Sequence, residues 1–169
     1  GKTYLLTANY DAANNDLSKA ITLNPNHEEA YKLRAVLYQL QDKNKEAISD
    51  LSTLIRLKPD NAFYHDSRAA LYAKTGQSAI AVADYTKAVG IESDYESEFR
   101  IRRGDLYLEQ KKYRAAIADY NAAVEEMPLR ISLYPKRAAA YCALGDKLAA
   151  RANWQTYKKH GGQKIEACR

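Results

Sequence analysis

The residues of this sequence that could do catalytic chemistry are three histidines and one short polar run. His27, His65 and His160 are widely separated, while His65-Asp66-Ser67 contains the residue types of a base, an acid and a nucleophile. Neighbouring residues of a helix point about 100° apart, so three consecutive side chains cannot hydrogen-bond in the order that a catalytic triad requires. We therefore predict that the chain has no catalytic site and is not an enzyme.

Metal and cofactor chemistry is equally poorly supported by the sequence. Cys142 and Cys168 form no CxxC or CxxH pattern with clustered histidines, so we predict two free thiols and neither a zinc site nor a disulfide. Gly76, Gly104 and Gly145 are isolated, whereas a phosphate-binding loop needs closely spaced glycines. We expect no metal and no cofactor.

The formal net charge of +5 comes from the second half of the chain. Residues 1–95 hold 11 Lys/Arg and 12 Asp/Glu, whereas residues 96–169 hold 15 and 9. Because Glu98, Asp105 and Glu109 lie among the cations, we favour a solvated face over one that attracts phosphate or an acidic partner. The members of this basic face are Arg100, Arg102, Arg103, Lys111, Lys112 and Arg114.

No part of the sequence is typical of a membrane span. A spanning helix needs roughly 20 consecutive apolar residues, and no run in this chain approaches that length. The residues after Gly1 do not have the basic start and apolar stretch of a signal peptide, although a segment removed before Gly1 would leave the same sequence. We expect a soluble chain, either cytoplasmic or exported.

Four similar segments recur along the chain. Residues 115–128 read AAIADYNAAVEEMP, after the earlier versions AANNDLSKAITLNP, EAISDLSTLIRLKP and IAVADYTKAVGIES. The central aspartates of the four versions are Asp16, Asp50, Asp84 and Asp119, with spacings of 34, 34 and 35 residues. A period between 20 and 50 residues is typical of a stacked repeat array.

Each period contains two helical stretches joined by a polar turn. We predict first helices at 28–41, 62–75, 97–110 and 132–144, and second helices at 12–23, 45–57, 78–91, 113–126 and 147–160. Small residues recur where the helices would cross, namely Ala35, Ala69, Gly104 and Ala138 in the first helices and Ala13, Ala47, Ala81, Ala116 and Ala150 in the second. A small side chain lets two helix backbones approach closely.

This pattern resembles the tetratricopeptide repeat from Gly1 to about residue 160. The 34-residue family signature has small residues at its eighth, twentieth and twenty-seventh positions, an aromatic at the eleventh and proline at the thirty-second. The resemblance implies an all-α, right-handed superhelix of stacked antiparallel helix pairs. We expect a single array over 1–162, with a truncated first repeat at 1–27, repeats at 28–61, 62–96, 97–130 and 131–162, and a tail at 163–169. Trp154 and Tyr157 should close the last repeat, and His160-Gly161-Gly162 should end its helix.

The resemblance also implies that one row of first helices lines a concave groove. The groove residues that we expect to contact a partner are Glu29, Lys32, Val36, Leu40, Phe63, Asp66, Ala70, Lys74, Glu98, Ile101, Asp105, Leu108 and Glu109. Two cations and five acids give this wall a net charge of −3, so we expect it to prefer an apolar segment that bears Lys or Arg. Each apolar member either contacts the partner or packs between neighbouring first helices.

The implied function is that of a scaffold or adaptor, which binds a peptide or helical segment of another protein and can belong to a larger complex. Some family members clamp acidic chaperone tails, but only Lys32 and Arg102 match that clamp, while Val36, Ser67 and Glu98 depart from it. We therefore expect no such clamp. The alternative is an accessory scaffold whose basic face binds RNA, an acidic protein or a membrane surface.

Overall fold

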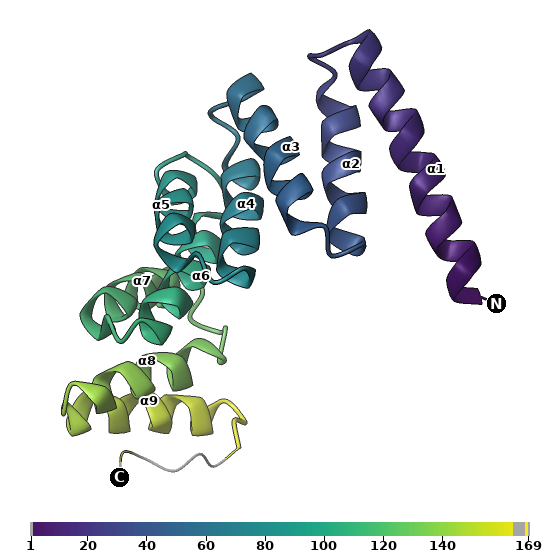
Figure 1. Ribbon diagram of the computed structural model, residues 1–169. Helices are drawn as coiled ribbons and strands as arrows, with labels where there is room; N and C mark the ends of the chain where they lie inside the picture. Colours follow the sequence, from purple (N-terminus) through teal and green to yellow (C-terminus); the bar gives the residue numbers. More distant parts are fainter. Residues whose placement is uncertain (1, 164–167, 169) are drawn as a thin grey trace. The chain divides into compact units, whose positions relative to one another are not determined.

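The computed structural model describes residues 2–163 and 168, with side chains in the first helix from Asn9 onward. Predictions that concern Gly1, and those for most of the tail at 163–169, lie outside the described residues. The regular elements of the described part are nine helices (Figure 1). They are α1 (Lys2–Leu23), α2 (Glu28–Leu40), α3 (Asn44–Leu57), α4 (Ala62–Lys74), α5 (Ser78–Val89), α6 (Glu96–Glu109), α7 (Tyr113–Glu126), α8 (Leu133–Ala143) and α9 (Lys147–Lys159).

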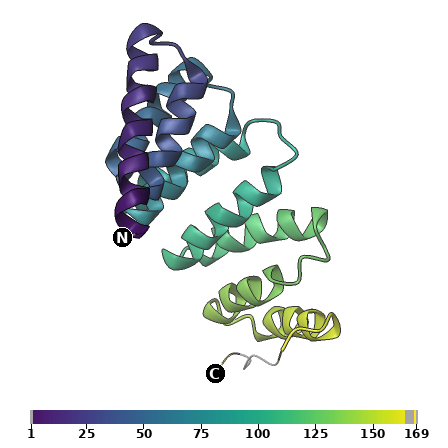
Figure 2. The same ribbon diagram turned by 90° about the vertical axis from the view of Figure 1, so that its right-hand side faces the viewer.

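The chain forms two compact units, Gly1–Asp84 and Tyr85–Arg169, called unit 1 and unit 2 below. Unit 1 contains α1 to α4 and the first part of α5, and unit 2 contains the rest of α5 and α6 to α9. Within each unit, successive helices are joined by short loops and pack as antiparallel pairs (Figures 1 and 2). The predicted all-α fold of stacked helix pairs is confirmed.

The turn inside each helical hairpin depends on one residue with a left-handed backbone. These residues are Asp42, Gly76, Lys111 and Gly145, with φ values of 55°, 77°, 59° and 79°. Their spacings of 34, 35 and 34 residues follow the sequence period. Because glycine adopts this conformation without steric cost, Gly76 and Gly145 suit the position best.

The first helix differs from the prediction. We expected a truncated first helix followed by a second helix at 12–23, but α1 runs without a break from Lys2 to Leu23. By the sequence period, Ala8 occupies the place of Asp42. Alanine is the strongest helix former and is disfavoured in the left-handed region, so the chain continues as helix where the other repeats turn.

The predicted crossing residues lie at the centres of the helix pairs. Buried alanines at these positions are Ala35, Ala47, Ala69, Ala81, Ala116, Ala138 and Ala150. At Gly104 the helices approach closely, because an added Cβ would lie 3.0 Å from Cε1 of Tyr120 and 3.3 Å from Cβ of Asp119. Larger residues such as Leu54 and Tyr120 are fully buried beside these positions.

Three helices of unit 1 meet at the side chain of Arg68. Its Nε and Nη2 donate to the two carboxylate oxygens of Asp84 at 2.7 and 2.8 Å, and its Nη1 donates to Oγ of Ser52 at 3.0 Å. Arg68 therefore joins α4 to α5 and to α3. We call this arrangement an arginine bridge.

The bridge recurs in both units and explains the repeated aspartate. In unit 1 Arg34 binds Asp50 and Ser18, while in unit 2 Arg103 binds Asp119 and Thr86, and Arg137 binds Asn153 and Asn121. The guanidinium groups also lie over tyrosine rings, such as Tyr72 at 5.9 Å from Arg68. The pKa of each Asp-bound arginine is raised, first by its hydrogen bond to the aspartate.

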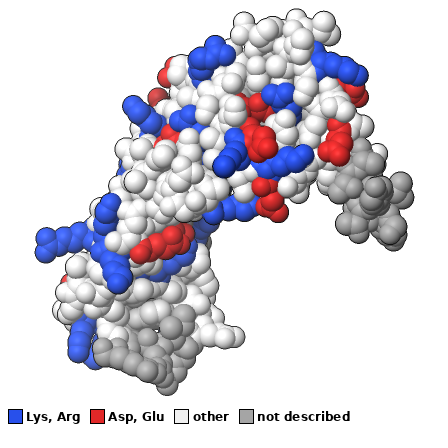
Figure 3. Space-filling view, viewed as in Figure 1, with Lys and Arg blue, Asp and Glu red and all other residues white. Residues whose placement is uncertain are grey.

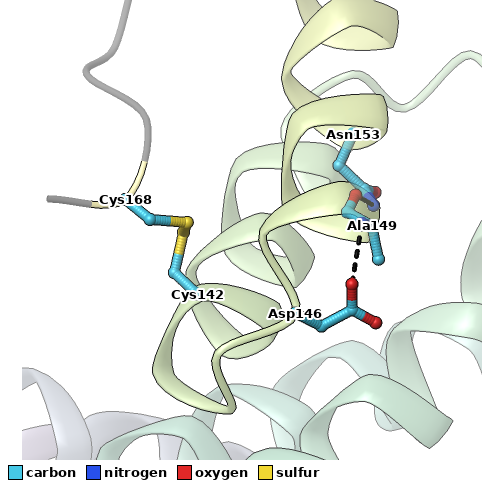
Figure 4. The surroundings of a disulfide bond; sticks show 5 residues. All are labelled: Cys142, Asp146, Ala149, Asn153 and Cys168. Carbon is cyan, nitrogen blue, oxygen red and sulfur yellow. Dashed lines mark hydrogen bonds between the residues drawn. A yellow bond between two sulfur atoms is a disulfide. The ribbon is translucent and has the colours of Figure 1, made fainter.

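The prediction of two free thiols is wrong, because Cys142 and Cys168 form a disulfide (Figure 4). Their Cα atoms lie 5.3 Å apart although 26 residues separate them in sequence. The predicted helix stop is confirmed: α9 ends at Lys159, and Gly161 has a φ of 87°. No cysteine spacing pattern encodes the proximity of Cys168 to Cys142 of α8.

Candidate partner-binding surface

The run His65-Asp66-Ser67, whose residue types match a catalytic triad, lies within α4. Nε2 of His65 lies 3.0 Å from the carbonyl oxygen of Pro59, and its Nδ1 lies 3.9 Å from Oδ1 of Asp84. His65 and Asp66 are both buried. The polar neighbours of His65 therefore come from the preceding turn and from an arginine bridge.

In unit 1, helices α2 and α4 are connected at both ends. The hydroxyl of Tyr64 donates to Oε1 of Glu28 at 2.6 Å, and Nζ of Lys74 donates to Oδ1 of Asp42 at 2.6 Å. Burial and then the neighbouring Glu28 raise the pKa of the Tyr64 hydroxyl, whereas the hydrogen bond from Lys74 lowers the pKa of Asp42. The two helices thus form one wall.

This α2/α4 wall exposes apolar side chains between its polar ends. Val36, Leu40 and Phe63 are 49%, 61% and 47% exposed. Leu33 is also exposed on α2, and the sequence analysis did not include it among the groove residues. A contiguous exposed apolar patch, unlike single exposed apolar residues, is typical of a protein-binding surface.

The other predicted groove residues of unit 1 are placed as follows. Lys32 pairs with Glu29 at 2.5 Å on the surface of α2, and Ala70 is exposed on α4. Asp66 is buried, so a partner that docks on the wall cannot reach its carboxylate. The cations Lys32 and Lys74 both have acidic partners on the protein itself.

In unit 2 the predicted apolar contacts pack inside the protein. Ile101 is buried in a cluster with Tyr120 and Leu133, and the half-buried Leu108 packs against the same cluster. The sequence left open whether these two residues contact a partner or pack between helices. In the structure both of them pack between helices.

The acidic groove residues of unit 2 are largely neutralised by neighbouring cations. Asp105 accepts hydrogen bonds from the hydroxyl of Tyr120 at 2.7 Å and from Nζ of Lys136 at 2.6 Å. Glu98 pairs with Arg130, while Glu109 is exposed. The net charge of −3 obtained from the sequence therefore overstates the acidity of this wall, because Lys136 and Arg130 were not counted.

Two of the six predicted basic-face cations are bound to carboxylates of the protein itself. Arg103 is held in an arginine bridge, and Arg100 pairs with Glu96. Arg102 is exposed elsewhere on α6, while the remaining cations surround an open depression of about 480 Å³. This depression is lined by Lys111, Lys112, Tyr113, Arg114, Ala115 and Leu144. Lys and Arg side chains project at several separate places on the molecule in Figure 3.

A sequence signal for the arginine bridges was present. Arg34, Arg68, Arg103 and Arg137 are spaced by 34, 35 and 34 residues, and each precedes the repeated Asp or Asn by 16. Two polar residues of opposite charge that share one period predict a recurring contact. The surface depression had no comparable signal, because Leu144 belongs to a different repeat from the three cations.

Comparisons with known proteins agree with this architecture. The family model described as Tetratricopeptide repeat matches residues 1–27 and 97–126. No curated protein matches the chain. Among the described residues, no helix is long and apolar enough to cross a membrane.

Several solved structures share the fold at low sequence identity. The crystal structure of the MamA protein has a TM-score of 0.81 at 17% identity, covering 98% of this chain and 94% of that one. YrrB, described as a TPR protein with an unusual peptide-binding site, has a TM-score of 0.78 at 18% identity, with 94% and 82% covered. The structure of pilF from Pseudomonas aeruginosa has a TM-score of 0.73 at 20% identity, covering 97% of this chain and 74% of that one.

The fold and the repeated hairpins define a helical-repeat scaffold. Two segments of the chain match the tetratricopeptide repeat model, and its described residues have the fold of a tetratricopeptide repeat solenoid.

Proposed function

We propose that the protein is an interaction scaffold that binds an apolar peptide or helical segment of a partner on the α2/α4 wall of unit 1. The observation that supports this most directly is the exposure of Val36, Leu40 and Phe63 on that wall. The peptide-binding site described for YrrB, which shares the fold, is a second support.

Association would rest mainly on burial of the three side chains. Removing a Val, Leu or Phe side chain from water contributes roughly 1.5–3 kcal/mol when burial is complete, before the cost of ordering the partner. The ion pairs Lys32–Glu29 and Lys74–Asp42 lie on or beside the wall and would orient the partner by polar contacts at its rim. An apolar segment with polar ends fits this arrangement.

On the predicted groove face of unit 2, three residues are engaged within the protein. Ile101 and Leu108 are occupied in the core, and Asp105 is bound to Lys136. Glu109 is the exposed acid of α6 on that face and would discriminate between basic and acidic partner segments.

Site-specific photo-crosslinking tests the proposal. A photoreactive amino acid placed at Ala70 should capture a partner in cell extract, and mass spectrometry should identify the captured peptide. The double variant Val36→Glu/Leu40→Glu should abolish capture, because it places two charges on the apolar wall.

Ile80→Glu is the matched control, since Ile80 is 46% exposed on α5 and lies outside the wall. This variant should capture the same peptide as the wild type. Equal capture by the wall double variant, or loss of capture in both, would show that the wall is not the binding surface.

A further inference from the structure

We propose that the depression beside the α6–α7 turn of unit 2 binds a protein segment in which carboxylates flank one apolar side chain. This turn pocket has a volume of about 480 Å³, within the usual range of ligand pockets of roughly 300–1,000 Å³. It lies on the turn between the helices of a hairpin and is therefore distinct from the α2/α4 wall.

Positive charge around the turn pocket is available to a ligand. Lys111, Lys112 and Arg114 are all exposed, and within the described residues none of them forms an ion pair. Arg103, which the sequence placed on the same basic face, is instead held by Asp119. Three cations without a carboxylate in the pocket lining would attract an acidic partner.

The backbone of the turn does not require a lysine. Lys111 has a φ of 59°, while Gly76 and Gly145 occupy the corresponding places in other hairpins. A lysine in this conformation costs free energy that glycine would avoid. Lys111 lines the turn pocket, where its charged side chain can meet a ligand.

One wall of the turn pocket is apolar. Leu144, at the C-terminal end of α8, lines it and is 44% exposed, and Leu148 in the first turn of α9 is also exposed. The nearby carboxylate of Asp146 is engaged, because it accepts a hydrogen bond from the backbone N–H of Ala149 at 3.0 Å (Figure 4). An apolar side chain fits against the leucine while its flanking carboxylates meet the cations. RNA would leave this leucine surface uncovered, so a protein segment matches the site better.

The equivalent turn of unit 1 has similar cations but different surroundings. Lys43 and Lys45 correspond to Lys112 and Arg114 by the sequence period. The place of Lys111 is taken by the acidic Asp42, and the place of Leu144 by the polar Thr75. This turn therefore supplies a control in which two corresponding cations can be reversed where the proposed chemistry is missing.

Fluorescence anisotropy with a labelled peptide tests the proposal on the full chain. The probe carries one Phe flanked on each side by two Glu, and the comparison peptides replace either Phe by Ser or all Glu by Gln. Lys112→Glu/Arg114→Glu should weaken binding of the probe by at least about tenfold, and added salt should weaken binding to the wild type. Lys43→Glu/Lys45→Glu, which changes the net charge equally, should leave the affinity within about twofold of the wild type.

A separate variant tests the apolar contact in the turn pocket. Leu144→Ser should weaken binding of the Phe peptide and bring its affinity close to that of the Ser peptide. The α2/α4 wall variant Val36→Glu/Leu40→Glu should bind the probe normally, so this result is independent of the proposed function.

Four results would overturn the proposal. These are no binding of the probe to the wild type, equal losses in the two charge-reversal variants, equal affinity for the Phe and Ser peptides, and tighter binding of an oligouridine than of the probe. The last result would make the turn pocket a nucleic-acid site. Circular dichroism of each variant confirms that the helices are intact.

Discussion

Arg68 and Asp84 are joined by two nearly parallel hydrogen bonds of 2.7 and 2.8 Å, although 16 residues separate them in sequence. Both side chains are largely buried, so the pair is shielded from solvent. Two-point contact between a guanidinium and a carboxylate fixes the relative orientation of the helices that carry them.

Removal of one member of this pair should be costly. We expect Asp84→Ala to lower the free energy of unfolding by roughly 3–5 kcal/mol, because Arg68 would remain buried without its counter-ion. Asp16→Ala is the matched control, since Asp16 holds the same repeat position but its side chain is 79% exposed and pairs with the exposed Lys19 at 3.5 Å. Urea denaturation should show no measurable change for this control. Equal effects of the two substitutions would contradict a structural role for the bridge.

The left-handed turn at Gly76 predicts a backbone effect without a steric one. An added Cβ at Gly76 would meet no atom within 4 Å, but its φ is 77°. We expect Gly76→Ala to lower the free energy of unfolding by about 1 kcal/mol, the backbone cost being partly offset by reduced freedom of the unfolded chain. Gly90→Ala should be neutral or stabilising, because the new Cβ would lie 3.5 Å from the carbonyl oxygen of Thr86. Thermal unfolding distinguishes these outcomes, and a larger loss at Gly90 would be contrary to the argument.

Tyr120 predicts a loss of stability at alkaline pH. Burial, and then the hydrogen bond to Asp105, raise the pKa of its hydroxyl in the folded protein above its ordinary value of about 10. The neutral hydroxyl is therefore favoured by folding, so its contribution is complete below pH of about 10 and is lost as the pH rises further. Near neutral pH, Tyr120→Phe should cost about 0.5–1.5 kcal/mol. Urea denaturation between pH 8 and 11 should show this difference shrinking; a difference that grows would refute the assignment.

The disulfide predicts a stability that depends on reductant. Closing the segment between Cys142 and Cys168, which are 26 residues apart, should contribute up to about 3–4 kcal/mol by limiting the unfolded chain. Reductant should lower the melting temperature of the wild type but not of Cys168→Ser. Thiol titration of the denatured, unreduced protein should detect no free cysteine. Disulfides persist in oxidising compartments, so two reactive thiols in protein trapped directly from cells would count against this bond.

The repeat period determined the fold because the interactions that define it are local. Ala47, Ala81 and Ala116 predicted helix crossings, since only a small residue allows two backbones to approach closely. The exception, the uninterrupted helix α1, has an equally local cause. Ala8 stands where the other repeats have a turn residue, so the helix continues.

The partners of polar side chains were decided by tertiary structure. Nothing in the sequence near Asp105 indicates that Lys136, 31 residues later, neutralises it, and the acidity of the wall was overstated for that reason. The same holds for Cys142 and Cys168, which form a disulfide although 26 residues separate them in sequence. Sequence spacing along a helix shows which residues share a face, but the contacts between faces depend on how successive hairpins stack. The sequence by itself thus determined the repeated hairpins, whereas their stacking decided which charges are paired and which apolar side chains remain exposed.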